Sequence, residues 1–422
     1  MYNLNNHYNT IFNIVDSIIR YPNIQYLHPF GSTEIKNLEA ISTSIDTNST
    51  WHSRTGVVVF CYDQEPLLYD YNQKLFTHVF NHSDGYRLRG KHVILLNTEL
   101  ESDDKDRILS EFNFIDCYCF FHIFAAHDWF REYYYDRQIT CPSTRKLSKK
   151  FITFNRLTSN ARIYRTLLVN ELINYNLLDD GNVSFSKDCP DGGKFEQHLI
   201  NNAKKYNIPD ELVTRAINNI NTTSHPLRID FTEEAIPNRS FCLDSIPTHM
   251  ESFLHIVTET NYWGRRKHLT EKIFKPIILK QPFVLVGCAH NLTYLKSYGF
   301  KTFDRWWSEE YDLIVDDIER MHYIGTLIDS ICQMSYSELE DILKEMQEIL
   351  DYNFNLFYSR EFLDLAINEL ELNLRTAIDT ACWTEEYRDY LIDCSTNQEA
   401  YETRQGVKAD LEDLNYYANR ST

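Results

Sequence analysis

Long hydrophobic runs are missing from this sequence. None of its apolar stretches approaches the roughly 20 residues that a membrane-spanning helix needs. Its first residues, MYNLNNHYNTIFNIV, lack the basic start and long apolar core of a signal peptide. The ten cysteines include no C-x-x-C pair, which favours small buried hydrophobic residues in a reducing compartment. These absences predict a soluble cytoplasmic protein without a membrane span.

An excess of basic charge is missing too. The 61 acidic and 42 basic residues give a formal net charge of −19, and such a surface repels nucleic acid and anionic membranes over most of its area. Nucleic acid is therefore not expected as the main partner. What the sequence does have is a globular composition, with 43% hydrophobic and 14% aromatic residues, and its 422 residues suffice for two domains with separate cores.

Buried strands alternate with helical segments in the first third of the chain. The apolar run Gly56–Tyr62 ends at Asp63-Gln64-Glu65-Pro66, and the two carboxylates fall on a loop because proline cannot extend strand pairing. A second strand at His92–Leu96 is followed by a helix through Asp106–Phe112 and an apolar stretch at Cys117–Phe124. This alternation predicts a parallel sheet.

A polar, basic segment at Arg137–Lys150 is interpreted as the linker to a second domain. The strand Phe151–Phe154 opens a second sheet, and a helix follows at Asn160–Tyr175. Beyond Asp304 the apolar spacing is helical nearly to the end, including helices at 337–353 and 361–378. We therefore predict an N-terminal domain at 1–148, a second domain at 149–345 with a loop-rich insertion at 187–250, and a mainly helical C-terminal region at 346–422.

The clearest local pattern lies between His255 and Gly287. The strand Phe253–Val257 ends at Thr258-Glu259, Thr270 is placed as the N-cap of a new helical segment, and Phe283–Gly287 is another buried strand. Open α/β sheets bind ligands at the carboxyl ends of such strands, where a helix N-terminus and a lysine favour phosphate. The charged side chains that this pattern brings to the edge are Glu259, Glu271 and Lys272.

This stretch resembles the donor-binding signature of GT-B glycosyltransferases of the α-1,3-fucosyltransferase type. In that family a strand ends in Phe-Glu-Asn, and a short loop leads to Tyr-(Ile/Val)-Thr-Glu-Lys at a helix start. The matching residues here are Thr258-Glu259-Thr260-Asn261 and His268-Leu269-Thr270-Glu271-Lys272. The chain departs from the pattern at Thr260, which separates the glutamate from the asparagine, and at His268, which replaces the tyrosine. The resemblance therefore identifies neither the nucleotide base nor the sugar.

A wider resemblance covers most of residues 56–355. It is to uncharacterised glycosyltransferase-like proteins of large phages and marine viruses, and it implies a virus-encoded protein acting in the host cytoplasm. The shared elements are DQEPL at Asp63–Leu67, AAxDW at Ala125–Trp129, Asn155-Arg156 after a strand, TEKxFKPI at Thr270–Ile277, GFKTF at Gly299–Phe303 and EYD at Glu310–Asp312.

The resemblances imply two Rossmann-like domains facing each other across a cleft, as in GT-B enzymes, with the nucleotide-sugar held mainly by the second domain. In the fucosyltransferase pattern the Glu of Thr-Glu-Lys lies against the donor ribose and the Lys against the diphosphate, which carries these roles to Glu271 and Lys272. An arginine from the first helix of the donor domain pairs with phosphate there. Either Arg162 or Arg165 matches, since both can share one face of that helix.

The remaining donor contacts stay open between binding and structural roles. Glu259 can accept a hydrogen bond from the donor sugar or ribose, or it can form a buried structural salt bridge. Asn155 and Arg156 directly follow a strand and can contact the donor or hydrogen-bond within their loop. Asn261 belongs to the family motif, and Thr270 brings a helix N-terminus towards the diphosphate.

Transfer with inversion needs a base that deprotonates the acceptor hydroxyl, as well as groups that stabilise charge on the leaving diphosphate. Asp63 and Glu65 are the candidates for the base, although Glu65 before Pro66 can instead fix the loop backbone and Asp63 can cap the next helix. His127, Asp128 and Trp129 could bind an acceptor sugar, but an aromatic core with a capping aspartate is the favoured interpretation.

We therefore predict an inverting, metal-independent transfer of a sugar from a nucleoside diphosphate to a glycan or other hydroxyl acceptor, with no cofactor. Asp63-Gln64-Glu65 also resembles the Asp-x-Asp of metal-dependent GT-A enzymes. The phosphate-binding candidates lie in the other half of the chain, however, as a GT-B enzyme predicts. Two alternatives are a catalytically silent virion or glycan-binding module and a sugar transferase acting on modified viral DNA, which the net charge of −19 disfavours.

Overall fold

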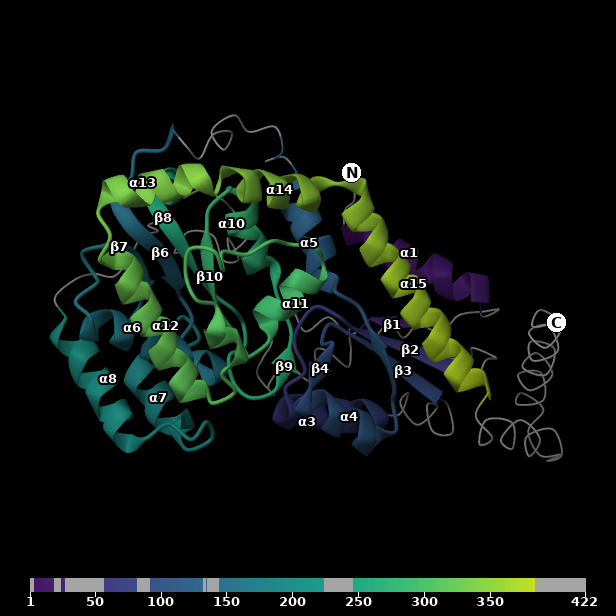
Figure 1. Cartoon of the computed structure of the whole chain (residues 1–422). Helices are drawn as coiled ribbons and strands as arrows, with labels where there is room; N and C mark the ends of the chain where they lie inside the picture. The colour runs from purple at the N-terminus through teal and green to yellow at the C-terminus, as the bar shows by residue number, and fades with distance from the viewer. Residues whose placement is uncertain are drawn as a thin grey trace, which may run out of the picture. The chain divides into compact units, whose positions relative to one another are not determined.

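The computed structural model describes residues 4–18, 24–26, 57–81, 92–131, 134, 144–223 and 246–383 (Figure 1). The chain divides into two compact units: unit 1 comprises Ala125–Leu363, and unit 2 comprises Tyr2–Phe124 together with Asp364–Thr422. The divisions fall inside two helices, α5 (Phe121–Trp129) and α15 (Arg360–Trp383). They differ from the predicted domain boundaries after residues 148 and 345, both of which fall within the sequence of unit 1.

The described part of unit 2 is built on four parallel strands in the order β1-β2-β3-β5. All six residues of β2 are buried, which is typical of an inner parallel strand covered on both faces. The rings of Phe60, Phe76 and Phe114 contact one another and bind the helices to the sheet. Its elements, besides parts of α5 and α15, are α1 (Leu4–Ile18), β1 (Ile24–Tyr26), β2 (Val57–Tyr62), α3 (Tyr69–Asn81), β3 (His92–Asn97), β4 (Glu101–Ser102), α4 (Asp103–Phe112) and β5 (Ile115–Tyr118).

Unit 1 contains a second sheet of four described parallel strands, in the order β10-β8-β6-β7. The strands are β6 (Lys149–Asn155), β7 (Gly181–Phe185), β8 (Ser252–Thr258) and β10 (Phe283–Val286). The chain passes from β6 to its neighbour β7 on one side and then returns to β8 on the other side of β6. This reversal is a topological switch point between β6 and β8, the place where open α/β sheets bind ligands.

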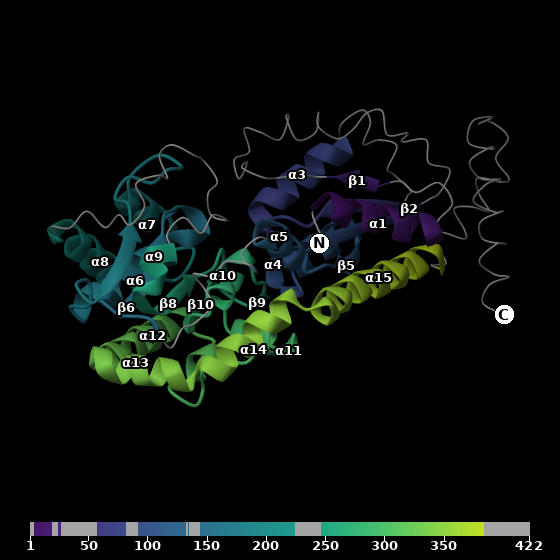
Figure 2. The same cartoon turned by 90° about the horizontal axis from the view of Figure 1, so that it is seen from above.

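Helices lie on both sides of this sheet. Figure 2 shows β6, β8 and β10 between α9 on one side and α12 and α13 on the other, and both α9 and α13 contact β8. The helices are η6 (Asn160–Ile163), α6 (Tyr164–Asn174), α7 (Phe195–Ala203), α8 (Asp210–Thr222), α9 (Ile246–Met250), η8 (Glu271–Ile273), α10 (Phe274–Ile278), α11 (Asn291–Ser297), η9 (Glu310–Leu313), α12 (Asp317–Cys332), α13 (Tyr336–Glu345) and α14 (Gln347–Tyr358); the short strand β9 is Arg266–Lys267.

The predicted α/β class with parallel sheets is confirmed, and so is the helical region towards the C-terminal end. The predicted helix at 160–175 begins as the 3-10 turn η6, and the helix predicted at 337–353 is two helices, α13 and α14, that meet at Met346. The first half of the predicted linker, residues 137–143, and the last segment, 384–422, lie outside the described residues. Of the described helices, none is both long and apolar enough to cross a bilayer.

Candidate functional site

The candidate site lies at the carboxyl edge of the unit 1 sheet, where β6 and β8 end at the switch point. β6 ends at Asn155 and β8 at Thr258, and the hydroxyl of Thr258 donates to the carbonyl oxygen of Phe154 at 2.7 Å, which joins the two strand ends. Glu259 follows directly and keeps its backbone N–H paired with the carbonyl oxygen of Val286 at 3.1 Å. Glu259 is therefore the first residue after β8, a strand that pairs with β6 on one side and with β10 on the other.

Thr270 begins the helical segment opposite this strand end. Its backbone is extended at φ −114°, and its side-chain oxygen accepts the backbone N–H of Lys272, so the predicted N-cap is confirmed. The segment that it caps is the three-residue 3-10 turn η8, followed by the five-residue helix α10. A helix this short has a weak dipole, so the charge offered to a ligand here comes from side chains.

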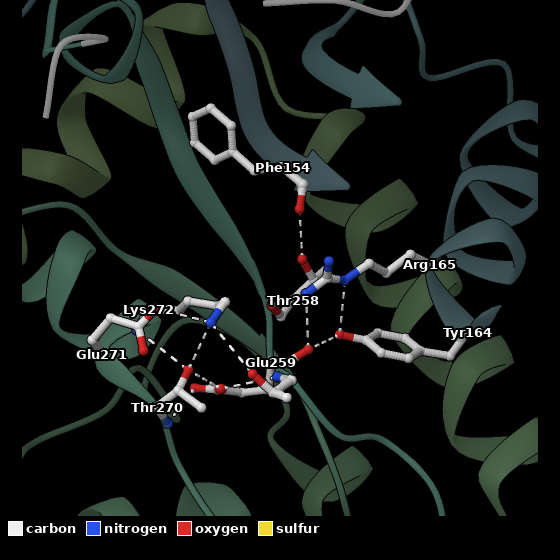
Figure 3. Close-up of polar contacts among 9 residues, drawn as sticks. Phe154, Tyr164, Arg165, Thr258, Glu259, Thr270, Glu271 and Lys272 are labelled. Atoms are coloured by element: carbon white, nitrogen blue, oxygen red, sulfur yellow. Dashed lines mark hydrogen bonds and ion pairs between the residues drawn. The ribbon is translucent and has the colours of Figure 1, made fainter. Parts of the chain in front are cut away.

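Glu259 and Thr270 form the centre of a hydrogen-bonded network (Figure 3). The Glu259 side chain is fully buried. One carboxylate oxygen accepts the Thr270 backbone N–H at 3.2 Å, and the other accepts the Thr270 hydroxyl at 2.5 Å and the Thr260 N–H at 3.3 Å. Burial raises the pKa of Glu259, while Lys272 and the Thr270 hydrogen bonds oppose that rise.

Lys272 extends from η8 into the same network. Its ammonium donates to a carboxylate oxygen of Glu271 at 2.9 Å and to the hydroxyls of Thr260 and Thr270, both at 3.3 Å. The Lys272 side chain is 27% exposed, whereas that of Glu271 is 6% exposed. The structure thus brings Glu259, Thr270, Glu271 and Lys272 together, and the lysine is the charged member of this set that solvent reaches most.

Arg165 lies on the other side of the Glu259 backbone (Figure 3). Its guanidinium donates to the carbonyl oxygens of Leu157 at 3.2 Å, Thr258 at 3.2 Å and Glu259 at 3.1 Å, and the residue is buried. These bonds give Arg165 a structural role in holding the end of β8. Arg162, the other predicted phosphate-binding arginine, is partly exposed.

Three buried polar atoms in the loops at this edge have no hydrogen-bond partner among the described residues. They are the side-chain oxygens of Asn155 and Thr158 and the amide nitrogen of Asn261. Asn155 and Thr158 are fully buried, and Asn261 is 4% exposed. Nearly all buried polar groups in proteins are paired. A polar ligand or an ordered water molecule can supply the partners of these three atoms.

The sequence interpretation missed residues that hold this site in shape. The Tyr164 hydroxyl donates to the Glu259 carbonyl oxygen, and its ring stacks on Tyr262 at a centroid distance of 4.8 Å. The amide of Asn291 donates to the carbonyl oxygen of His268 at 3.1 Å and accepts its N–H at 3.2 Å. Asn291 lies 23 residues from His268, so no local pattern identifies this pair.

The shared GFKTF and EYD elements have structural roles in unit 1. The carboxylate of Asp312 accepts the backbone N–H groups of Leu292 and Thr293, both at 2.8 Å, at the start of α11. Glu309 accepts the Phe303 N–H and the Thr302 hydroxyl, both at 2.7 Å. These bonds hold the segment that follows β10. The two motifs therefore stabilise the surroundings of the carboxyl edge of the sheet.

The candidate base Asp63 lies at the carboxyl end of β2 in unit 2. It is fully buried, and one carboxylate oxygen is 2.8 Å from Nε2 of His7 on α1, which is fully buried as well. Glu65, two residues further, is partly exposed. The pairing of Asp63 with a residue 56 positions earlier shows that Asp63 anchors α1 to the sheet.

The aromatic AAxDW element lies on α5. The His127 ring stacks on Phe357 at a centroid distance of 4.5 Å, and burial lowers its pKa to about 4. Asp128 accepts from Arg131 at 2.7 Å, and Trp129 is partly exposed. These contacts fit the aromatic-core interpretation, and a role of the three residues in acceptor binding stays a prediction.

Among the described residues, no group of three or more His, Cys, Asp or Glu side chains is placed to hold a metal ion. The predicted metal independence is a statement about the reaction and stays a prediction. No protein-family model, curated protein or solved structure matches the chain.

Proposed function

We propose that this protein transfers a sugar from a nucleoside diphosphate to a hydroxyl group and binds the nucleotide-sugar at the carboxyl edge of the unit 1 sheet. The observation that carries the proposal is the set of unpaired buried atoms on Asn155, Thr158 and Asn261, at the switch point that also holds the Lys272 network. A ligand with several hydroxyl and phosphate groups supplies the partners that these atoms lack.

The roles of the donor residues follow from their exposure and from the resemblance to fucosyltransferases. The Lys272 ammonium is the accessible cation for the diphosphate, and it stabilises the charge that develops there as the sugar leaves. Glu271 binds the ribose of the donor. Arg162 is the better candidate for a second phosphate contact, because it is partly exposed whereas Arg165 is buried.

Unit 2 supplies the base in this proposal, in a GT-B-like arrangement of two Rossmann-like domains. Deprotonation of an acceptor hydroxyl requires a carboxylate that the acceptor can reach. Glu65 is partly exposed, whereas Asp63 is fully buried against His7, so Glu65 is the preferred base. The reaction is proposed to invert the anomeric configuration and to need no metal ion.

The test is a thermal-shift screen of the full chain with GDP, UDP, ADP, CDP and dTDP, each with Mg²⁺ and with EDTA. A nucleotide at 100 times its dissociation constant stabilises the folded state by about 2.7 kcal/mol, which is easily detected. Stabilisation by one nucleotide in EDTA is the expected result, followed by release of that nucleotide from its sugar conjugate when acceptors are supplied. If none of the five nucleotides stabilises the protein, the donor site is refuted. Binding of a nucleotide without turnover would favour the catalytically silent module.

A further inference from the structure

The Glu259 carboxylate lies inside the proposed donor site, and among the described residues it accepts hydrogen bonds only from neutral groups. All three hydrogen bonds to its side chain come from Thr270 and Thr260, through two backbone N–H groups and one hydroxyl. The Lys272 ammonium, whose charge favours the ionised carboxylate, bonds to Glu271 and to the two threonine hydroxyls instead. A fully buried carboxylate without a direct ion pair is costly to keep charged.

The charges at this edge already compensate one another. Lys272 is paired with Glu271 at 2.9 Å, and Arg165 is held against the carbonyl oxygen of Glu259 at 3.1 Å. With both carboxylates ionised, two negative charges stand against these two cations. A diphosphate at Lys272 would therefore bring further negative charge close to Glu259 without any uncompensated cation among these four residues.

We propose that a nucleoside diphosphate binds to this edge together with one proton, which the Glu259 carboxylate takes up from solvent. This inference rests on the proposed function and adds a pH dependence to the same site. The Lys272 ammonium turns from the Thr270 oxygen to the phosphate, and the protonated carboxyl donates to the Thr270 oxygen in its place. The Thr270 hydroxyl hydrogen is then free to turn towards the ligand. One O–H bond forms on Glu259 as one bond to hydrogen breaks in the buffer acid, and the buried site loses one negative charge as the phosphates arrive.

The sign of the effect follows from the groups that face Glu259. Lys272 and the Thr270 donors favour the ionised carboxylate, whereas burial and Glu271 oppose it. From α6, Arg165 and Tyr164 contact the Glu259 carbonyl oxygen. Burial raises the pKa of Glu259, and a bound diphosphate raises it further because like charges repel. The protonated form therefore binds the ligand more tightly, and affinity falls as pH rises, by at most about tenfold per pH unit for one proton.

The experiment is isothermal titration of the nucleoside diphosphate that binds most tightly among the five, in two buffers with different ionisation enthalpies, between pH 6 and 8.5. The difference in heat between the buffers counts the protons taken up. Wild type, Glu259→Gln and a control, Glu345→Gln, are compared with the same ligand, so the ligand's own titration is common to all three. The control removes a carboxylate on α13 whose side chain is 56% exposed and lies outside the network. Glutamine at 259 can imitate the protonated side chain, since it keeps one acceptor and offers one donor to Thr270.

We expect wild type and Glu345→Gln to take up more protons than Glu259→Gln and to lose affinity relative to it as pH rises, whereas Glu259→Gln keeps only the change that the ligand's own titration causes. Equal proton uptake in wild type and Glu259→Gln would overturn the inference, and so would a ratio of their affinities that does not change with pH. If Glu259→Gln does not fold, wild type is titrated with the nucleotide-sugar, whose diphosphate has no group that ionises in this pH range. Proton uptake then supports the inference, and no uptake overturns it. Failure of all five nucleotides to bind at any pH would instead refute the proposed function, and the inference with it.

Discussion

The hydroxyl of Thr270 lies between Glu259 and Lys272 and connects them. It donates to the Glu259 carboxylate at 2.5 Å and accepts the Lys272 backbone N–H at 3.4 Å and the Lys272 ammonium at 3.3 Å. One side chain therefore caps the η8 turn, stabilises a buried carboxylate and positions the lysine. The Thr-Glu-Lys motif is a structural unit as well as a candidate binding site.

Replacement of Thr270 by valine should destabilise unit 1 by about 1–3 kcal/mol, because it keeps the shape of the side chain but removes the cap and a donor to the buried Glu259. The measurement is the free energy of unfolding in urea. Thr270→Ser is the matched control, since serine keeps the hydroxyl, and it should cost clearly less than valine. Equal losses for serine and valine would show that the methyl group, and not the hydroxyl, is what Thr270 contributes.

Replacement of Lys272 by alanine should weaken nucleoside diphosphate binding by about 10- to 100-fold, which corresponds to roughly 1.5–3 kcal/mol for a hydrogen bond to a charged group. The fold should persist, since the side chain is 27% exposed. Titration calorimetry with the nucleotide found in the screen gives the affinity. The control is Lys344→Ala on α13, which removes the same charge from a lysine whose side chain is 55% exposed and paired with Asp341. An equal loss of affinity in both variants would indicate a general effect of charge.

Local patterns in the sequence predicted the framework of this site. A buried strand ending at Thr258 with one histidine among apolar residues, a threonine N-cap at 270 and an apolar run from Phe283 to Val286 are each specified by neighbouring residues. Contacts between distant residues could not be predicted in this way. Thr270 binds Glu259 across 11 positions, Tyr164 binds its carbonyl oxygen across 95, and Asp63 binds His7 across 56. Such pairs depend on the order of the strands, which a single sequence does not state.

The choice between the two candidate phosphate-binding arginines could not be made from the sequence for the same reason. Arg162 and Arg165 are equivalent by spacing, because residues three apart share a helix face. The structure separates them, since the chain starts as the 3-10 turn η6 and becomes α6 only at Tyr164. Arg165 then points to the end of β8, where carbonyl oxygens of Thr258 and Glu259 lie within 3.2 Å of its guanidinium.

Substitutions at Asp63 and Glu65 should separate a structural carboxylate from a catalytic one. Asp63→Ala leaves the buried His7 without its partner and should cost about 1–3 kcal/mol of stability. Glu65→Gln should change the free energy of unfolding much less and reduce turnover by at least about 100-fold if Glu65 is the base. Both are checked by urea unfolding together with nucleotide release from the sugar donor. A stable Asp63→Asn variant that has lost turnover, beside an active Glu65→Gln, would transfer the role of base to Asp63.

Two buried histidines in unit 1 should make its stability sensitive to acid. Nδ1 of His249 donates to the side-chain oxygen of Gln281 at 2.9 Å, the His249 ring is 5.0 Å from that of His255, and both residues are at most 3% exposed. Burial lowers the pKa of His249 to about 3, and burial together with His249 and Lys275 lowers the pKa of His255 well below its usual value. Both histidines are therefore neutral in the folded protein at pH 7.

Because these folded-state pKa values lie below the unfolded value of about 6.5, the unfolded chain binds protons that the folded chain does not. The free energy of unfolding should therefore fall as pH drops below about 6.5, by up to roughly 1.4 kcal/mol per pH unit for each histidine, until the pH reaches the folded-state pKa. Urea unfolding of wild type and His249→Gln at pH 7, 6 and 5 measures this. The variant should be less stable at pH 7 but lose stability more slowly towards pH 5, because one of the two groups no longer titrates. Parallel losses in wild type and variant would mean that carboxylates, and not His249, set the acid sensitivity.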